Sequence, residues 1–88
     1  MTAEAMTMQV QYDPEADAIY IELRESEGAV ENDQLDDRRM VDYDARGEAV
    51  GVELLFVSEG VDLEGLPEAD VIAAALRQLG ALTLSGAA

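Results

Sequence analysis

The chain has 88 residues with 20 Asp and Glu against five Arg, so its formal net charge at pH 7 is −15. This negative charge repels phosphate groups, which argues against direct binding to nucleic acids or to anionic membranes. The absence of Cys excludes disulfides and thiolate metal sites, and the absence of His removes the commonest metal ligand and general base.

The length fits one small domain, residues 1–88, with frayed ends expected at residues 1–7 and 85–88. A chain this short buries only about 60–65% of the surface of its unfolded state, so its stability is marginal unless something adds to it. No apolar run is long enough to cross a membrane, and no signal peptide is visible. We therefore expect a cytoplasmic protein without a cofactor.

Two segments near the N-terminus, Met8–Tyr12 and Ala18–Glu25, alternate apolar and polar residues. This period of two predicts half-buried strands. Residues 13–17 separate them, and Pro14 within this segment favours a turn because it cannot donate to a strand ladder. The two segments therefore predict a hairpin, in which Tyr20 faces away from the apolar positions of its strand.

The next segment, Ser26–Asp37, is rich in acid and Gly and contains few apolar residues. We interpret it as a surface loop with a short strand near Val30. The segment Met40–Phe56 again alternates with a period of two, which predicts a second hairpin around a turn at Asp44–Gly47. Gly51 interrupts the second strand and indicates a bulge or a close approach by another backbone.

The C-terminal part combines a loop and a helix. The loop, Ser58–Leu66, has three apolar residues that we expect to pack against the sheet: Val61, Leu63 and Leu66. Apolar residues at helical spacing predict one helix over Pro67–Leu79, which Gly80 ends. The predicted fold is α+β: a four-stranded antiparallel sheet of two successive hairpins, with one C-terminal helix packed on one face.

Two segments together resemble a known family. The first is YDPEADAIYI, residues 12–21, and the second is DYDARG from Asp42, followed by VGVELL from Val50. This pairing resembles the small prokaryotic family called domain of unknown function 2283, whose members look like YDPEADALYI followed by VDYDxxGxxVGIEIL. The resemblance covers residues 8–56 and implies a compact, strand-rich module. The family carries no established activity, but some relatives are encoded beside small toxin-like proteins, which implies a role with a partner.

Asp42, Asp44 and Glu53 match part of the template of a calcium-binding loop, with Gly47 at the expected turn position. Arg46 stands where an oxygen ligand belongs, and the flanking segments are strands instead of helices. These three carboxylates are therefore candidate metal ligands, with Asp44 as a cap of the hairpin turn as the favoured alternative.

Two further acidic groups have a structural and a chemical interpretation. Asp13, Glu15 and Asp17 could hold a divalent ion, but Pro14 favours a turn in which Asp13 and Asp17 bond local backbone groups. Asp42 and Glu53 fall on one sheet face, where a pair of carboxylates can act as acid and base if one is desolvated. Without a His or Lys partner for any Ser, we expect no enzymatic activity.

Apolar and aromatic residues on the presumed polar face suggest that another chain covers it. The interface candidates are Tyr20, Gly51, Leu55 and Val57. The leading hypothesis is a non-enzymatic binding or assembly module that acts as a homodimer. One alternative is an acidic partner that neutralises a small basic, toxin-like protein. Another is a weak divalent-metal or enzymatic site at the three candidate carboxylates.

Overall fold

The computed structural model describes residues 8–25, 28–29 and 31–79, and the ends expected to fray, 1–7 and 85–88, lie outside the described residues. Five strands, a 3-10 turn and one helix make up this part of the chain. In chain order they are β1 (Gln9–Asp13), β2 (Ala18–Glu22), β3 (Glu31–Gln34), β4 (Arg39–Tyr43), β5 (Ala49–Leu55), η1 (Val57–Glu59) and α1 (Ala69–Leu79).

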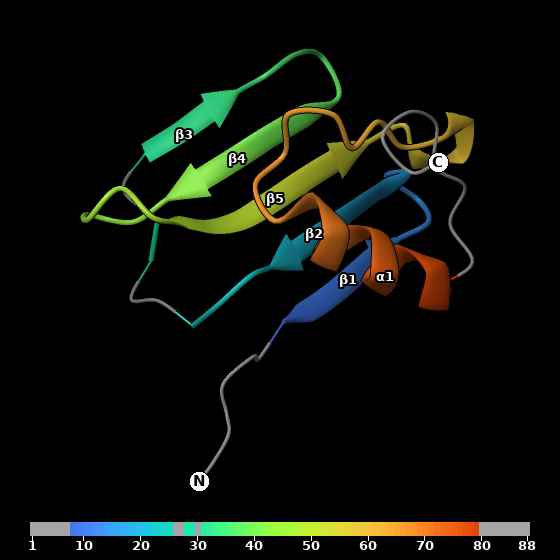
Figure 1. Cartoon of the computed structure of the whole chain (residues 1–88). Coiled ribbons are helices and arrows are strands. Elements are labelled where there is room, and N and C mark those ends of the chain that lie inside the picture. The colour runs from blue at the N-terminus through green and yellow to red at the C-terminus, as the bar shows by residue number, and fades with distance from the viewer. Residues whose placement is uncertain (1–7, 26–27, 30, 80–88) are drawn as a thin grey trace, which may run out of the picture.

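All five strands form one antiparallel sheet in the order β1-β2-β5-β4-β3. Pairing of β2 with β5 joins the N-terminal hairpin to a meander of the other three strands. In this pairing Ile21 lies opposite Val52. Figure 1 shows α1 and the segment that leads to it on one face of the sheet. The α+β class with one C-terminal helix on one face is therefore confirmed.

The prediction of four strands is wrong, because β3 is a fifth strand within the segment expected to be a loop. Its residues Glu31, Asn32, Asp33 and Gln34 are all polar and exposed. They carry no apolar alternation, and pairing with β4 alone makes them a strand. β3 begins one residue after Val30, near which a short strand was expected, and Val30 itself lies outside the described residues.

The core lies between the sheet and α1. Residues that face each other on neighbouring strands share a sheet face, so the pairs Ile19–Leu54 and Val41–Val52 define the side that carries the helix. The buried cluster comprises Ile19, Ile21, Leu23, Val41, Val52, Leu54, Val57, Val61, Leu63, Leu66, Ile72, Ala73 and Leu76. The predicted packing of the three apolar loop residues against the sheet is confirmed.

Arg39 holds the segment between β5 and α1 against the sheet. Its Nε and Nη2 donate to Asp36 Oδ2 at 3.0 and 2.8 Å. Its Nη1 donates to the backbone oxygens of Asp62, at 3.2 Å, and of Glu64. The side chain is only 13% exposed. The planar guanidinium of Arg39 therefore ties the segment after β5 to the sheet through hydrogen bonds. Arg suits this role better than Lys.

The helix begins two residues later than expected, at Ala69. Glu68 has a φ of 54° and accepts hydrogen bonds on its backbone oxygen from the N–H groups of Val71 and Ile72, both at 3.0 Å. A residue with positive φ does not fit into a right-handed helix, so α1 cannot extend through Glu68 towards the N-terminus. Pro67 therefore lies in the preceding turn. The Glu68 carboxylate pairs with Arg24, which follows β2. None of the helices in the described residues is long and apolar enough to cross a membrane.

Asp side chains cap the turns of the sheet. Asp13 Oδ1 accepts the backbone N–H groups of Glu15 and Ala16 at 3.1 and 3.3 Å, as expected. Asp17 instead makes a distant contact: its Oδ1 accepts the N–H of Ser58 at 2.9 Å, and its Oδ2 accepts the Ser58 hydroxyl at 2.7 Å. The expectation of purely local bonds was therefore right for Asp13 and wrong for Asp17.

Candidate docking face

The side of the sheet opposite α1 is formed by the strand residues that alternate with those of the core. We call it the open face, because α1, the one α-helix among the described residues, lies on the other side (Figure 1). By strand register its residues are Gln9, Gln11, Asp13, Ala18, Tyr20, Glu22, Asn32, Gln34, Met40, Asp42, Gly51, Glu53 and Leu55.

Tyr20 covers Gly51 on this face. A Cβ atom added to Gly51 would lie 1.9 Å from the Tyr20 hydroxyl oxygen and 2.6 Å from the ring carbon that carries it. No side chain can therefore stand at position 51 while the Tyr20 ring keeps its place. Of the two interpretations of Gly51, the bulge is supported by a register shift beside it, where Asp42 pairs with Gly51 but Tyr43 pairs with Ala49. The group that approaches Gly51 closely is the Tyr20 side chain, not another backbone.

Two hydrogen bonds hold Asp42 at the centre of this arrangement. The Tyr20 hydroxyl donates to Asp42 Oδ2 at 3.0 Å, and the amide of Asn32 donates to Asp42 Oδ1. The first contact links β2 to β4 across the glycine of β5, and the second links β4 to its neighbour β3. Burial, followed by the Asp42 carboxylate, raises the pKa of Tyr20 to about 12. The hydroxyl therefore keeps its proton, and its donor role, at neutral pH.

The open face is acidic. It carries four carboxylates, Asp13, Glu22, Asp42 and Glu53, and none of its strand positions holds an Arg. Glu22 and Glu53 are both half-buried, and Glu53 lies in the middle of the sheet, opposite Met40 on β4. Arg38, just before β4, lines a small pocket together with Met40, Glu53 and Leu55, so one cation lies beside the acidic surface. Four carboxylates on a partly buried surface outweigh this single cation and create a negative potential that attracts further cations.

Apolar surface accompanies the carboxylates at one end of this face. Ala18 and Leu55 oppose each other on β2 and β5, and both are half-buried, as is Met40. Phe56 follows immediately, 47% exposed and with a φ of 56°. The Arg38 guanidinium lies 5.6 Å from the centroid of its ring. Phe56 directly precedes η1, and its left-handed backbone turns the chain out of β5.

The candidate metal ligands do not converge. Asp44 caps the hairpin turn, as its alternative predicted: its Oδ1 accepts the N–H groups of Glu48 and Arg46 at 3.0 and 2.9 Å. The hydrogen bond from the Glu48 backbone N–H lowers the pKa of the Asp44 carboxyl. Asp42 and Glu53 share the open face, but on diagonal positions of β4 and β5. Within the described residues no three carboxylates come together as a metal site.

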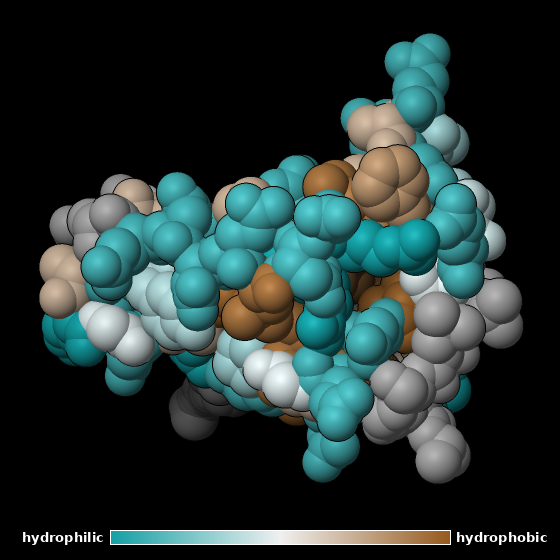
Figure 2. Space-filling model, turned by 90° about the horizontal axis from the view of Figure 1, so that it is seen from above, coloured by the Kyte–Doolittle hydropathy of each residue, from teal (hydrophilic) through white to brown (hydrophobic). Residues whose placement is uncertain are grey.

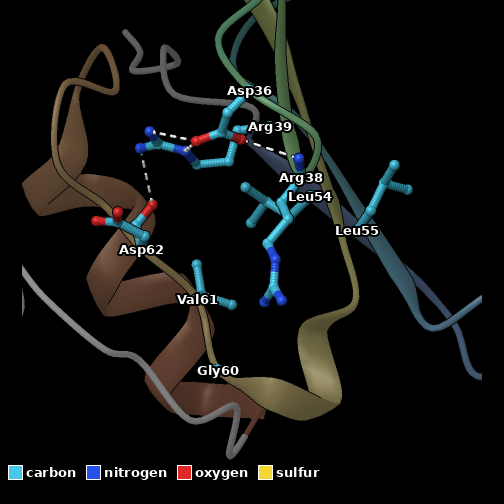
Figure 3. Close-up of a pocket in the computed structure, with 8 residues that line it drawn as sticks. All are labelled: Asp36, Arg38, Arg39, Leu54, Leu55, Gly60, Val61 and Asp62. Atoms are coloured by element: carbon cyan, nitrogen blue, oxygen red, sulfur yellow. Dashed lines mark hydrogen bonds and ion pairs between the residues drawn. The ribbon is translucent and has the colours of Figure 1, made fainter.

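A pocket of about 230 Å³ lies between the ends of β4 and β5 and the segment that follows them. Figure 3 shows Arg39 at its rim, bonded to Asp36 and to Asp62, with the Arg38 side chain extending past Val61. The Arg39 guanidinium lowers the pKa of Asp36. The remaining lining residues are Leu54, Leu55 and Gly60. The donors of Arg39 are bonded to other residues of the chain. This pocket is therefore part of the contact that holds the segment after β5 against the sheet.

The four interface candidates have different positions. Tyr20 and Leu55 lie on the open face, and Gly51 lies beneath the Tyr20 ring. Val57 is 6% exposed and belongs to the core, so the prediction that it faces outwards is wrong. The strand ends at Leu55, and the positive φ of Phe56 turns the chain, so alternation no longer applies to the residue that follows.

Sequence reasoning missed the partnership of Tyr20 with Asp42. The signal was present in part, since both residues fall at outward positions of predicted strands and Gly51 falls at an outward position between them. Only the strand order β2-β5-β4 brings the three residues together. The alternation of residues within single strands does not reveal the order of the strands. Met40 was also missed, although its alternation with Val41 indicated the outward face.

Comparison with known proteins identifies one family. The model of the family described as "Protein of unknown function (DUF2283)" matches residues 9–58, which span all five strands and the first two residues of η1. No curated protein and no solved structure matches the chain. The matched segment contains the whole open face, whereas α1 lies outside it.

Proposed function

The chain belongs to the DUF2283 family of proteins of unknown function, and on that premise we propose that it is a non-enzymatic binding module whose open face docks a basic segment of another protein. The observation that carries the proposal is the pairing of Glu22, Asp42 and Glu53 with half-buried apolar side chains on a sheet face that has no Arg at its strand positions. We place this module in the cytoplasm of a prokaryotic cell.

Charge complementarity favours a basic partner over a second copy of the chain at this face. Two open faces packed together would bury eight carboxylates, four from each chain, with no Arg at the strand positions between them. Like charges at a desolvated contact cost several kcal/mol, whereas Lys or Arg from a partner would neutralise them. The net charge of −15 also speeds the approach of a cationic protein at low salt.

The rigidity of the face supports the same role. Tyr20 is held by its hydrogen bond to Asp42 and by contact with Gly51, so its ring has a defined place before any partner arrives. A contact surface that is already ordered loses less conformational entropy on binding. Half-buried Met40 and Leu55 offer apolar contact positions among the carboxylates of the open face.

A titration with a synthetic peptide tests the charge requirement. The probe is an extended peptide in which Lys alternates with Val, added to the full chain in a calorimeter. The double variant Glu22→Gln with Glu53→Gln removes two open-face charges. We expect it to weaken peptide binding by about tenfold or more, since each lost contact to a cation is worth about 0.5–1.5 kcal/mol.

The matched control is Asp33→Asn with Glu64→Gln, which removes the same charge from exposed positions outside the open face. We expect a change of less than about twofold from this pair, through overall charge alone. Equal losses from both pairs would contradict the proposal. A pull-down from the native cell then uses the wild type and both double variants as bait. A basic protein should be retained by the wild type and the control and lost from the open-face variant.

A further inference from the structure

The two edges of the sheet differ in how they are protected from pairing with other strands. β3, at one edge, carries two carboxylates among its four residues, and all four are exposed. Figure 2 looks from above onto the side where β3 lies in Figure 1, and hydrophilic side chains dominate it. Charges on an edge strand keep other strands away. β1, at the opposite edge, has one charge, Asp13, at its last residue.

From this contrast we infer that β1 pairs with β1 of a second copy of the chain, edge to edge, and joins two sheets into one continuous sheet of ten strands. The occupant is argued from the sequence of β1 itself, QVQYD. An antiparallel pair centred on Gln11 places Gln11 opposite its own copy, Val10 opposite Tyr12, and Gln9 opposite Asp13. No carboxylate faces a carboxylate, and an amide lies opposite each Asp13.

The apolar side of this pair covers a ring that is otherwise exposed. Val10 and Tyr12 lie on the helix side of β1, opposite Ile21 and Ile19 of β2. Val10 already packs against the core, but Tyr12 is 55% exposed. Pairs of an aromatic with a β-branched residue across antiparallel strands are favourable. The dimer therefore extends the hydrophobic layer beneath α1 across the two-fold axis.

The geometry also limits the strength of the contact. A ribbon of five residues buries less than the roughly 800 Å² per partner of a standard stable interface, so the dimer is reversible. Two chains with a charge of −15 each repel at long range, and salt screens this repulsion. Self-association should therefore strengthen with salt. Binding of a basic partner to the open face should weaken with salt, so the two proposals succeed or fail separately.

Sedimentation velocity of the full chain tests the inference. Between about 1 and 100 µM we expect a shift from monomer to dimer, with a dissociation constant that falls by roughly tenfold from about 0.05 to 0.5 M NaCl. Gln11→Glu and Gln11→Lys each place like charges together at the two-fold axis and should each weaken the dimer by about tenfold or more. An equimolar mixture of the two should associate again, because Glu then faces Lys.

Gln34→Glu, the same change at the β3 edge, is the matched control and should leave the dimer unchanged. Recovery in the mixture distinguishes a lost contact from a damaged fold, since two unfolded variants would not rescue each other. A chain that stays monomeric under all these conditions overturns the inference. So does a dimer that ignores both Gln11 variants, or a mixture that associates no better than either variant alone.

Discussion

The two faces of the same five strands make an instructive comparison. On the helix side, Ile21, Val41 and Val52 are fully buried, and their apolar side chains pack in the hydrophobic core. On the open face, the Tyr20 ring covers Gly51, and Asp42 accepts one hydrogen bond from Tyr20 and another from Asn32. The helix side therefore determines whether the chain folds, whereas the open face determines the surface that the fold presents.

The largest effect should come from the helix side. Ile21→Ala removes a side chain that is 0% exposed and leaves a cavity in a small core, so we expect a loss of about 3 kcal/mol of unfolding free energy. Met40→Ala, at a half-buried position of the open face, is the matched comparison and should cost about 1 kcal/mol or less. Urea denaturation followed by circular dichroism measures both. Equal losses would abolish the distinction between the faces.

A smaller effect should follow from Gly51→Ala. The new methyl group would overlap the Tyr20 ring, so the ring must move away and its hydrogen bond to Asp42 must break, at a cost of about 1–2 kcal/mol. In the background of Tyr20→Ala the same change should cost clearly less, because the clash has gone. A double-mutant cycle measures this coupling. Additive losses would show that the ring does not depend on the glycine.

The smallest effect should be one of pH. The pKa of Tyr20 is raised from 10.0 to about 12 in the folded chain, so the fold favours the protonated hydroxyl. Its contribution is fully present below the unfolded pKa and is lost as pH rises from about 10 to about 12. Tyr20→Phe should therefore lose less stability than the wild type over this range, measured as melting temperature. Parallel curves for the two proteins would argue against a perturbed Tyr20.

Individual strands were more predictable than their arrangement. The alternation in residues 18–25 and 40–56 located β2, β4 and β5, and the Asp44–Gly47 turn followed from local hydrogen bonding that Asp and Gly favour. The four polar residues of β3 gave no periodic signal, because an edge strand that buries neither face needs no apolar alternation. Val57 was misplaced because the positive φ of Phe56 ends the strand before it.

The sequence by itself determined the α+β class, the family, the acidic surface and the alternation that separates two faces. These properties depend on neighbouring residues or on composition, so short-range patterns contain them. Only the tertiary structure decided that β5 lies between β2 and β4, and hence that Tyr20 covers Gly51 and donates to Asp42. Strand order depends on contacts between residues that are distant along the chain, and the open face exists as a defined surface only through those contacts.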